Sequence, residues 1–254
     1  MKKIKSIVDN ILKIETVMGI VVLGMITLIS CNMPKIIEEG EEKLTTYSEV
    51  TKKALGTIVI DPGHGGADPG KIGVNGEKEK DINLSISLIL RDTLVSKGYN
   101  VVMTRCYDQH LNESESEFNK REDLDKRCQV INNAYVSNPS TIVISIHQNS
   151  FTQESAKGPQ VFYYGGSDRS RSLAEIMQKT MNESLRIEKP RKAKENNDYY
   201  MLVKTKCPAV IVECGFLSNT MEAKKLGDIE YQKQICETIL SGIQQYTVAI
   251  SPDL

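Results

Sequence analysis

The residues of this chain that could carry chemistry are few, and they lie in well-separated segments. Three histidines occur among 254 residues: His64 in DPGHGG, His110 in a polar stretch and His147 in SIHQNS. Glu79 lies in the charged stretch EKEKD, and Glu213 follows four apolar residues. Imidazole nitrogens and a carboxylate oxygen are the ligands of many catalytic zinc ions. Two histidines and one glutamate, with a second glutamate to move a proton, therefore fit a hydrolytic zinc centre.

Each of these residues also has a purely structural interpretation. His64, flanked by glycines, would bond a loop carbonyl, and His147 is either satisfied internally or bound to metal. Glu79 would be a solvated carboxylate at a helix start, whereas a buried Glu213 needs a partner or a proton. His110 follows no strand and is expected on the surface. The spacing contains no H-E-x-x-H segment, which excludes a thermolysin-type helix.

The segments between these residues alternate between short β-branched runs and helical periodicity. Strands are expected at 57–60, 100–104, 141–146, 160–164 and 209–212, and helices at 81–97, 121–136, 170–186 and 230–247. This alternation predicts a single three-layer α/β/α domain with a mostly parallel sheet. His64, His147 and Glu213 each follow an expected strand directly. Because ligands of open α/β sheets bind beyond the carboxyl ends of the strands, we expect these side chains to converge there, with Glu79 facing the same crevice.

The composition excludes several functional classes. Lys plus Arg number 32 against 33 Asp plus Glu, for a net charge of −1, and the chain has no Trp. A nucleic-acid-binding protein normally has an excess of basic residues, which this chain lacks. Six cysteines form no C-x-x-C pair, which argues against a zinc ribbon or a thioredoxin-type motif. The cysteines are therefore expected to be free thiols.

The N-terminal residues are expected to direct export. An uncharged, largely apolar segment, residues 16–34, follows four lysines, so residues 1–34 are interpreted as a membrane anchor or a cleaved signal peptide. The sequence LISC, ending at Cys31, also resembles a lipobox, which would make Cys31 a lipidated N-terminus. Residues 35–55 are charged without apolar periodicity and are expected to be a linker. Residues 56–250 are then the catalytic domain.

Four ordered sequence blocks resemble the zinc-dependent N-acetylmuramoyl-L-alanine amidases of the Amidase_3 family. The blocks are D-P-G-H-G-G-x-D-P-G, Glu79 within G-E-K-E-K-D, S-I-H-Q-N-S and V-E-C-G-F-L-S-N, and the resemblance covers about residues 56–248. The resemblance implies one zinc ion held by His64, Glu79 and His147, with Glu213 as the catalytic acid/base. It also implies cleavage of the amide between the lactyl group of N-acetylmuramic acid and the L-alanine of peptidoglycan.

Further segments, among them KREDLDKRCQVIN and RKAKENNDYYML, resemble the sporulation amidases within this family. That likeness implies work on spore cortex peptidoglycan, in the intermembrane space or cortex of the developing spore. A muramic acid deacetylase would act next, so that muramic-δ-lactam forms for germination. One departure is Cys214, where small or aliphatic residues are common. Its thiol would add an unwanted metal ligand, although its side chain is expected on the opposite strand face.

Substrate contacts and regulation are less determined by the sequence. Asn149, two residues past His147, would contact substrate or support the site. Arg191 and Lys192 would meet stem-peptide carboxylates or form a solvated basic loop. A protein partner that orders residues 105–120 or 188–200 would control zinc affinity. Two other functions stay open: a zinc peptidase acting within the stem peptide, and a catalytically silent protein that binds peptidoglycan or a partner.

Overall fold

A six-stranded sheet carries the segments that hold the candidate residues. The computed structural model describes residues 54–113 and 118–250. Its strands are β1 (Thr57–Pro62), β2 (Asn100–Met103), β3 (Ile142–Asn149), β4 (Gln160–Tyr163), β5 (Lys194–Glu195) and β6 (Ala209–Phe216). They lie in the order β2-β1-β3-β6-β4-β5, and every neighbouring pair is parallel except β4 with β6. The predicted, mostly parallel sheet is confirmed.

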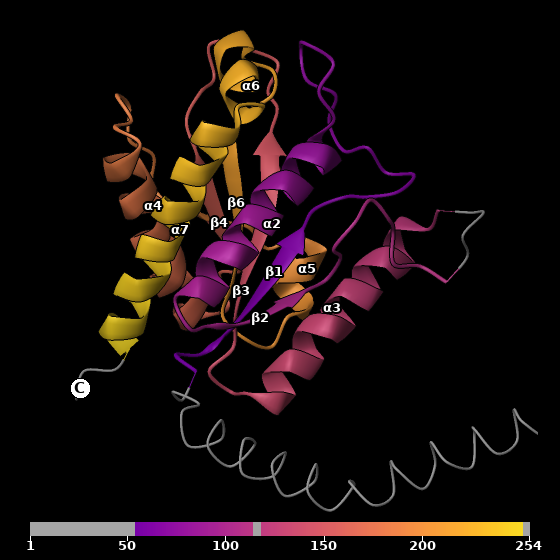
Figure 1. Ribbon diagram of the computed structural model, residues 1–254, viewed down its shortest axis with the longest axis vertical. Helices are drawn as coiled ribbons and strands as arrows, with labels where there is room; N and C mark the ends of the chain where they lie inside the picture. Colours follow the sequence, from indigo (N-terminus) through magenta and orange to yellow (C-terminus); the bar gives the residue numbers. More distant parts are fainter. Residues whose placement is uncertain (1–53, 114–117, 251–254) are drawn as a thin grey trace, which may run out of the picture. The chain divides into compact units, whose positions relative to one another are not determined.

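Helices cover both faces of this sheet, as Figure 1 shows. One face packs against α2 (Glu79–Ser96), α4 (Asp168–Ser184) and α7 (Ile229–Ile250), and the other packs against α3 (Lys120–Ser137) and α5 (Tyr200–Lys204). The short helix α6 (Thr220–Leu226) follows β6. The predicted three-layer α/β/α architecture is therefore confirmed.

Strand alternation sends successive side chains into the two separate cores. In β1, Ile58 and Ile60 join the core under α2, α4 and α7, whereas Val59 joins the core under α3 and α5. In β3 and β6 the same parity places Ile146 and Val212 in the first core. His147 and Glu213, one position further along each strand, therefore face the α3 and α5 side of the sheet.

Every predicted strand and helix overlaps an element of the structure, but several bounds differ. Strands β3 and β6 continue past their apolar runs, so the expectation that His147 and Glu213 follow their strands was wrong: both lie inside them, paired with each other in register. Parallel backbone pairing continues through these residues although their side chains are polar. The sequence analysis also missed three short elements, β5, α5 and α6, which lack a recognisable apolar period.

The N-terminal hydrophobic segment, Cys31 and the linker up to residue 53 lie outside the described residues. Within the residues that the structure does describe, no helix combines the length and apolar character needed to cross a membrane.

Candidate functional site

The segment after β1 is a glycine-rich loop that brings His64 to the carboxyl edge of the sheet. His64 has a backbone φ of 61°, in the left-handed region that side chains with a Cβ rarely adopt. Gly63 lies against the ring of His147: a Cβ at this position would stand 2.2 Å from Cε1 of that ring. The loop therefore needs a glycine here, because any side chain would occupy the space that His147 fills.

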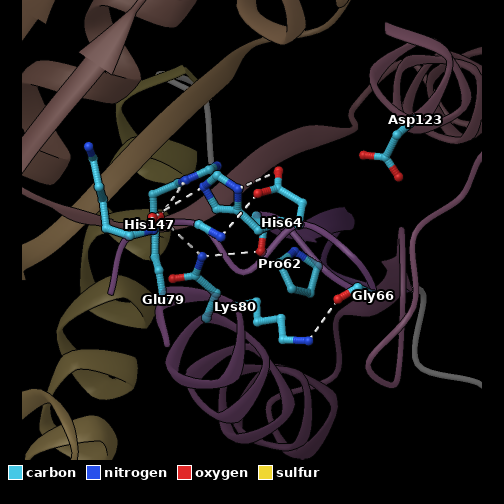
Figure 2. Close-up of polar contacts among 12 residues, drawn as sticks. Pro62, His64, Gly66, Glu79, Lys80, Asp123 and His147 are labelled. Atoms are coloured by element: carbon cyan, nitrogen blue, oxygen red, sulfur yellow. Dashed lines mark hydrogen bonds and ion pairs between the residues drawn. The ribbon is translucent and has the colours of Figure 1, made fainter. Parts of the chain in front are cut away.

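His64, Glu79 and His147 meet around one point. The Nε2 atom of His64 lies 3.2 Å from Oε2 of Glu79, and Nδ1 of His147 lies 2.9 Å from Oε1 of the same carboxylate. The two imidazole rings stand edge to face with centroids 5.0 Å apart. One ligand atom from each residue lies within 4.8 Å of the others, and Figure 2 shows both rings turned toward Glu79. Two nitrogens and one carboxylate in this arrangement fit the donor set of zinc.

Glu79 is buried and ionised, which rules out a solvated helix-start carboxylate. Its side chain is 3% exposed, although it belongs to the first turn of α2. The backbone N–H groups of Lys71 and Gln148 donate to its two oxygens at 2.9 and 3.1 Å. Burial alone would raise the pKa of Glu79, but hydrogen bonds from His147 and His64 hold that pKa well below its usual range. The carboxylate is therefore preformed as an anionic ligand.

The second ring nitrogen of His64 is held by Asp68, which the sequence analysis missed. Nδ1 of His64 lies 2.8 Å from Oδ2 of Asp68, and Oδ1 of Asp68 accepts a hydrogen bond from the Gly70 N–H. Burial would lower the pKa of His64, but the carboxylates of Asp68 and Glu79 raise it to about 9. A histidine that binds a metal through one ring nitrogen usually donates a hydrogen bond from the other ring N–H, often to a carboxylate such as this one. The signal in the sequence was an aspartate four residues after His64 in a glycine-rich loop.

Glu213 lies beside this cluster without belonging to it. It is the register partner of His147 on the neighbouring strand and is 9% exposed. Its Oε2 atom is buried and has no hydrogen-bond partner among the described residues. Burial raises the pKa of Glu213 to about 7; Glu79 adds to this rise, while the two histidines oppose it. A carboxyl group with this pKa can accept and release a proton near neutral pH.

These residues line a pocket with a volume of about 540 Å³. Tyr199 and Tyr200, at the start of α5, contribute to its wall, and so do Lys71 and Lys120. Asn149 also lines the pocket, with its Oδ1 atom accepting from the backbone N–H of Ser150. The position of Asn149 is compatible with either of its predicted roles. Tyr199 belongs to the segment RKAKENNDYYML, which carried a resemblance in the sequence analysis, but no role in the site was assigned to it there.

The structure does not bring every predicted residue to this pocket. Arg191 is not among its lining residues; the guanidinium donates to the carbonyl of Lys157 and lies 5.1 Å from the ring centre of Phe216. A substrate contact through Arg191 stays a prediction. His110, expected on the surface, is partly buried with its ring 5.8 Å from that of Phe118.

Cys214 lies where strand alternation predicted it. Its side chain is 1% exposed and belongs to the core under α2, α4 and α7, on the opposite face of β6 from Glu213. The thiol is thus separated from the side chains of His64, Glu79 and His147 by the sheet itself. The five cysteines that the structure describes are all free, as expected.

A buried ionic network forms part of the pocket wall. Asp61, at the end of β1, accepts hydrogen bonds from Thr104, Ser145 and Arg127 at 2.6, 2.7 and 2.8 Å. Burial alone would raise the pKa of Asp61, but Arg127 and the two hydroxyl groups lower it to about 2. The network ties the ends of β1 and β2 and the middle of β3 to α3, next to the loop that carries His64.

Comparison with known proteins gives one consistent result. A family model described as N-acetylmuramoyl-L-alanine amidase matches residues 58–245. The germination-specific N-acetylmuramoyl-L-alanine amidase of Bacillus subtilis is 35% identical over 192 residues, which cover 74% of this chain and 78% of that protein. The solved CwlD amidase from Clostridioides difficile, in complex with the GerS lipoprotein, is 35% identical with a TM-score of 0.69, covering 78% of this chain and 99% of that one. An N-acetylmuramoyl-L-alanine amidase from Clostridium difficile 630 is 31% identical with a TM-score of 0.66, covering 75% of this chain and 95% of that one.

Proposed function

Because the chain belongs to the Amidase_3 family of N-acetylmuramoyl-L-alanine amidases, we propose that it is a zinc enzyme acting on spore cortex peptidoglycan. The bond cleaved is the amide between N-acetylmuramic acid and L-alanine. One observation carries the proposal: His64, Glu79 and His147, from three distant parts of the chain, meet in one pocket beside the buried carboxyl of Glu213.

The three clustered residues are the proposed zinc ligands. His64 and His147 would each offer the ring nitrogen that faces Glu79, and Glu79 would offer a carboxylate oxygen. When bound, a zinc ion supplies Lewis acidity toward the scissile carbonyl and makes water a nucleophile at neutral pH. Asp68 keeps the ring of His64 in one orientation, so this nitrogen stays directed at Glu79.

Glu213 is the proposed proton carrier of the reaction. Water adds to the lactyl carbonyl carbon, and the carboxylate of Glu213 takes the proton that the water gives up. The same group then protonates the nitrogen of L-alanine as the carbon–nitrogen bond breaks. The products are a lactyl carboxylate on muramic acid and a free stem peptide. A pKa of about 7 allows Glu213 to serve in both directions at neutral pH.

The description of one relative supports the cortex as the site of action. The Bacillus subtilis relative is described as germination-specific. We propose that this chain likewise removes stem peptides during spore formation, after which a muramic acid deacetylase permits formation of muramic-δ-lactam. We further propose that the protein is exported, as a membrane-anchored or secreted enzyme, through its N-terminal hydrophobic segment.

A protein partner is also proposed. The CwlD amidase from Clostridioides difficile was solved in complex with the GerS lipoprotein, which supports a partner for the present chain. We infer that such a partner acts on the loops around the site and tightens zinc binding. Equal zinc dissociation constants with and without the partner would contradict this inference.

Product analysis tests the function. Purified full-length protein, loaded with zinc, is incubated with cortex muropeptides, and the products are separated and identified by mass spectrometry. We expect muramic acid residues with a free lactyl carboxyl group together with intact stem peptides. Shortened stems would instead indicate a zinc peptidase, and unchanged muropeptides would indicate a silent binding protein. Spores that lack the protein should contain no muramic-δ-lactam.

A further inference from the structure

The backbone conformation of His64 needs external support. Within the described ranges, His64 and Arg186 are the only residues other than glycine with a positive φ. In the left-handed region the Cβ atom crowds the following carbonyl, so this conformation persists only where the surroundings hold it. Gly65 and Gly66 continue the run of positive φ values, at 136° and 56°. A relaxation of φ at His64 would carry its ring away from Glu79 and His147.

Arg127, which projects from α3, holds the carbonyl of this residue. One terminal nitrogen of its guanidinium donates to the carbonyl oxygen of His64 at 2.7 Å, and the other donates to that of Pro62 at 2.7 Å. Asp61 and Asp123 anchor the same guanidinium at 2.8 and 2.7 Å. The side chain is only 2% exposed, so water does not compete for these contacts.

A second buried arginine holds neighbouring carbonyls but not that of His64. Arg105, just after β2, donates to the carbonyl oxygens of Pro62 and Gly63, both at 2.9 Å, and of Lys80 at 3.0 Å. Lys80 in turn donates to the carbonyl of Gly66 at 2.8 Å, a contact visible in Figure 2. Three cations, Arg127, Arg105 and Lys80, thus hold the loop carbonyls, and Arg127 is the one that reaches the carbonyl of His64.

We propose that Arg127 is a positioning residue of the metal site, which fixes the backbone of His64 and so directs its ring at Glu79 and His147. The inference rests on the proposed role of His64 as a metal ligand. A rigid planar fork is required, because four acceptors in different directions must be reached from one buried group. The single ammonium of a lysine could satisfy Asp61 but could not also span the carbonyls of Pro62 and His64.

The test compares Arg127→Lys with Arg105→Lys in the full-length protein. Three quantities are measured: the zinc dissociation constant in competition with a chelating indicator, the visible spectrum of the cobalt-substituted protein, and the Tm of the metal-free protein. We expect Arg127→Lys to weaken zinc binding by about tenfold or more and to change the cobalt spectrum, as for other residues that orient metal ligands. Arg105→Lys should lower the Tm comparably, yet keep the parent spectrum and an affinity within about threefold of the parent.

Equal losses of zinc affinity in the two variants, or a folded Arg127→Lys with parent affinity and spectrum, would overturn the inference. His64→Ala separates this result from the proposed function: zinc binding as tight as in the parent would mean that His64 is no ligand at all. Should Arg127→Lys fail to fold, Asp123→Asn removes one anchor of the guanidinium and is measured in the same way. Parent affinity in that variant would also count against Arg127.

Discussion

His147 and Glu213 lie directly opposite each other on the neighbouring parallel strands β3 and β6. Both side chains therefore project from the same face of the sheet, one into the cluster of His64, Glu79 and His147 and the other beside it. The backbone pairing that joins the two strands fixes the separation of these groups. The proposed proton carrier is thus held next to one of the proposed metal ligands by strand pairing.

Replacing Glu213 by glutamine should separate catalysis from metal binding. Because Glu213 is not in the three-residue cluster, Glu213→Gln should bind zinc like the parent. The amide cannot take up or release the proton, so we expect muropeptide cleavage to slow by roughly 10²- to 10⁴-fold. Zinc content by elemental analysis and product formation by chromatography check the two halves of this prediction. Parent-like turnover in the variant would remove Glu213 from the mechanism.

Removing one imidazole of the cluster should instead remove the metal. His147→Ala deletes the ring that faces Oε1 of Glu79, and we expect the zinc dissociation constant to rise by at least about 100-fold. His110→Ala is the matched control, because His110 is partly buried but lies outside the cluster. Both variants are dialysed against a chelator and titrated with zinc. If His147→Ala and His110→Ala bound zinc equally well, the assignment of ligands would fail.

A methyl group on Gly63 should displace His147 without changing any ligand. The added Cβ would stand 2.2 Å from the ring, so the ring must move and zinc binding should weaken by at least about tenfold. Gly76→Ala is the control: its φ is 91°, yet no atom lies within 4 Å of the added carbon. That variant should lose about 1 kcal/mol of stability through backbone strain and keep the parent zinc affinity. Comparable zinc affinities in the two variants would contradict the close packing of Gly63 against His147.

Acid should weaken the fold through Asp61. The pKa of Asp61 in the folded protein is about 2, below the value of 3.8 for an unperturbed aspartate. The ionised carboxylate therefore adds to the free energy of unfolding above pH 4, and this stabilisation is lost as the pH falls toward 2. This lowering of the pKa corresponds to about 2 kcal/mol of unfolding free energy. The difference in unfolding free energy between the parent and Asp61→Asn should therefore shrink by about that amount between pH 5 and pH 2. Urea denaturation of the metal-free proteins measures this, with Asp92→Asn as an exposed control; a constant difference for Asp61 would refute the prediction.

Cys214 should be dispensable for the metal site. Because its thiol faces the core on the far side of β6, Cys214→Ala should still bind one zinc ion per chain with the parent affinity. We expect only a loss of packing, about 1 kcal/mol of stability. Zinc titration gives the stoichiometry and affinity of zinc binding, and thermal unfolding gives the loss of stability. A change in stoichiometry or in the cobalt spectrum would show that the thiol reaches the metal.

The fold was largely predictable because its strands and helices are marked by apolar residues at regular spacing. The short elements were not, since β5 has only two residues, both charged, and α5 has only five, too few to show an apolar period; their positions depend on packing against β4 and α3. His64, His147 and Glu213 were found because each stands next to an apolar or glycine-rich segment, whereas Glu79 lies in a charged stretch and was singled out as a ligand through the family resemblance. Asp68 and Arg127 were missed because their roles depend on contacts with loop backbone and on distances that only folding creates.

The spacing of the three clustered residues along the chain sets an order of events. Fifteen residues separate His64 from Glu79, and 68 separate Glu79 from His147. In zinc fingers the ligands lie close together, and the ion itself drives folding. Here the donors converge only after α2 and β3 have docked on β1, so a fragment that ends before residue 147 has no chelating site. A metal ion at this position would therefore need these elements to be assembled before all three donors could bind it.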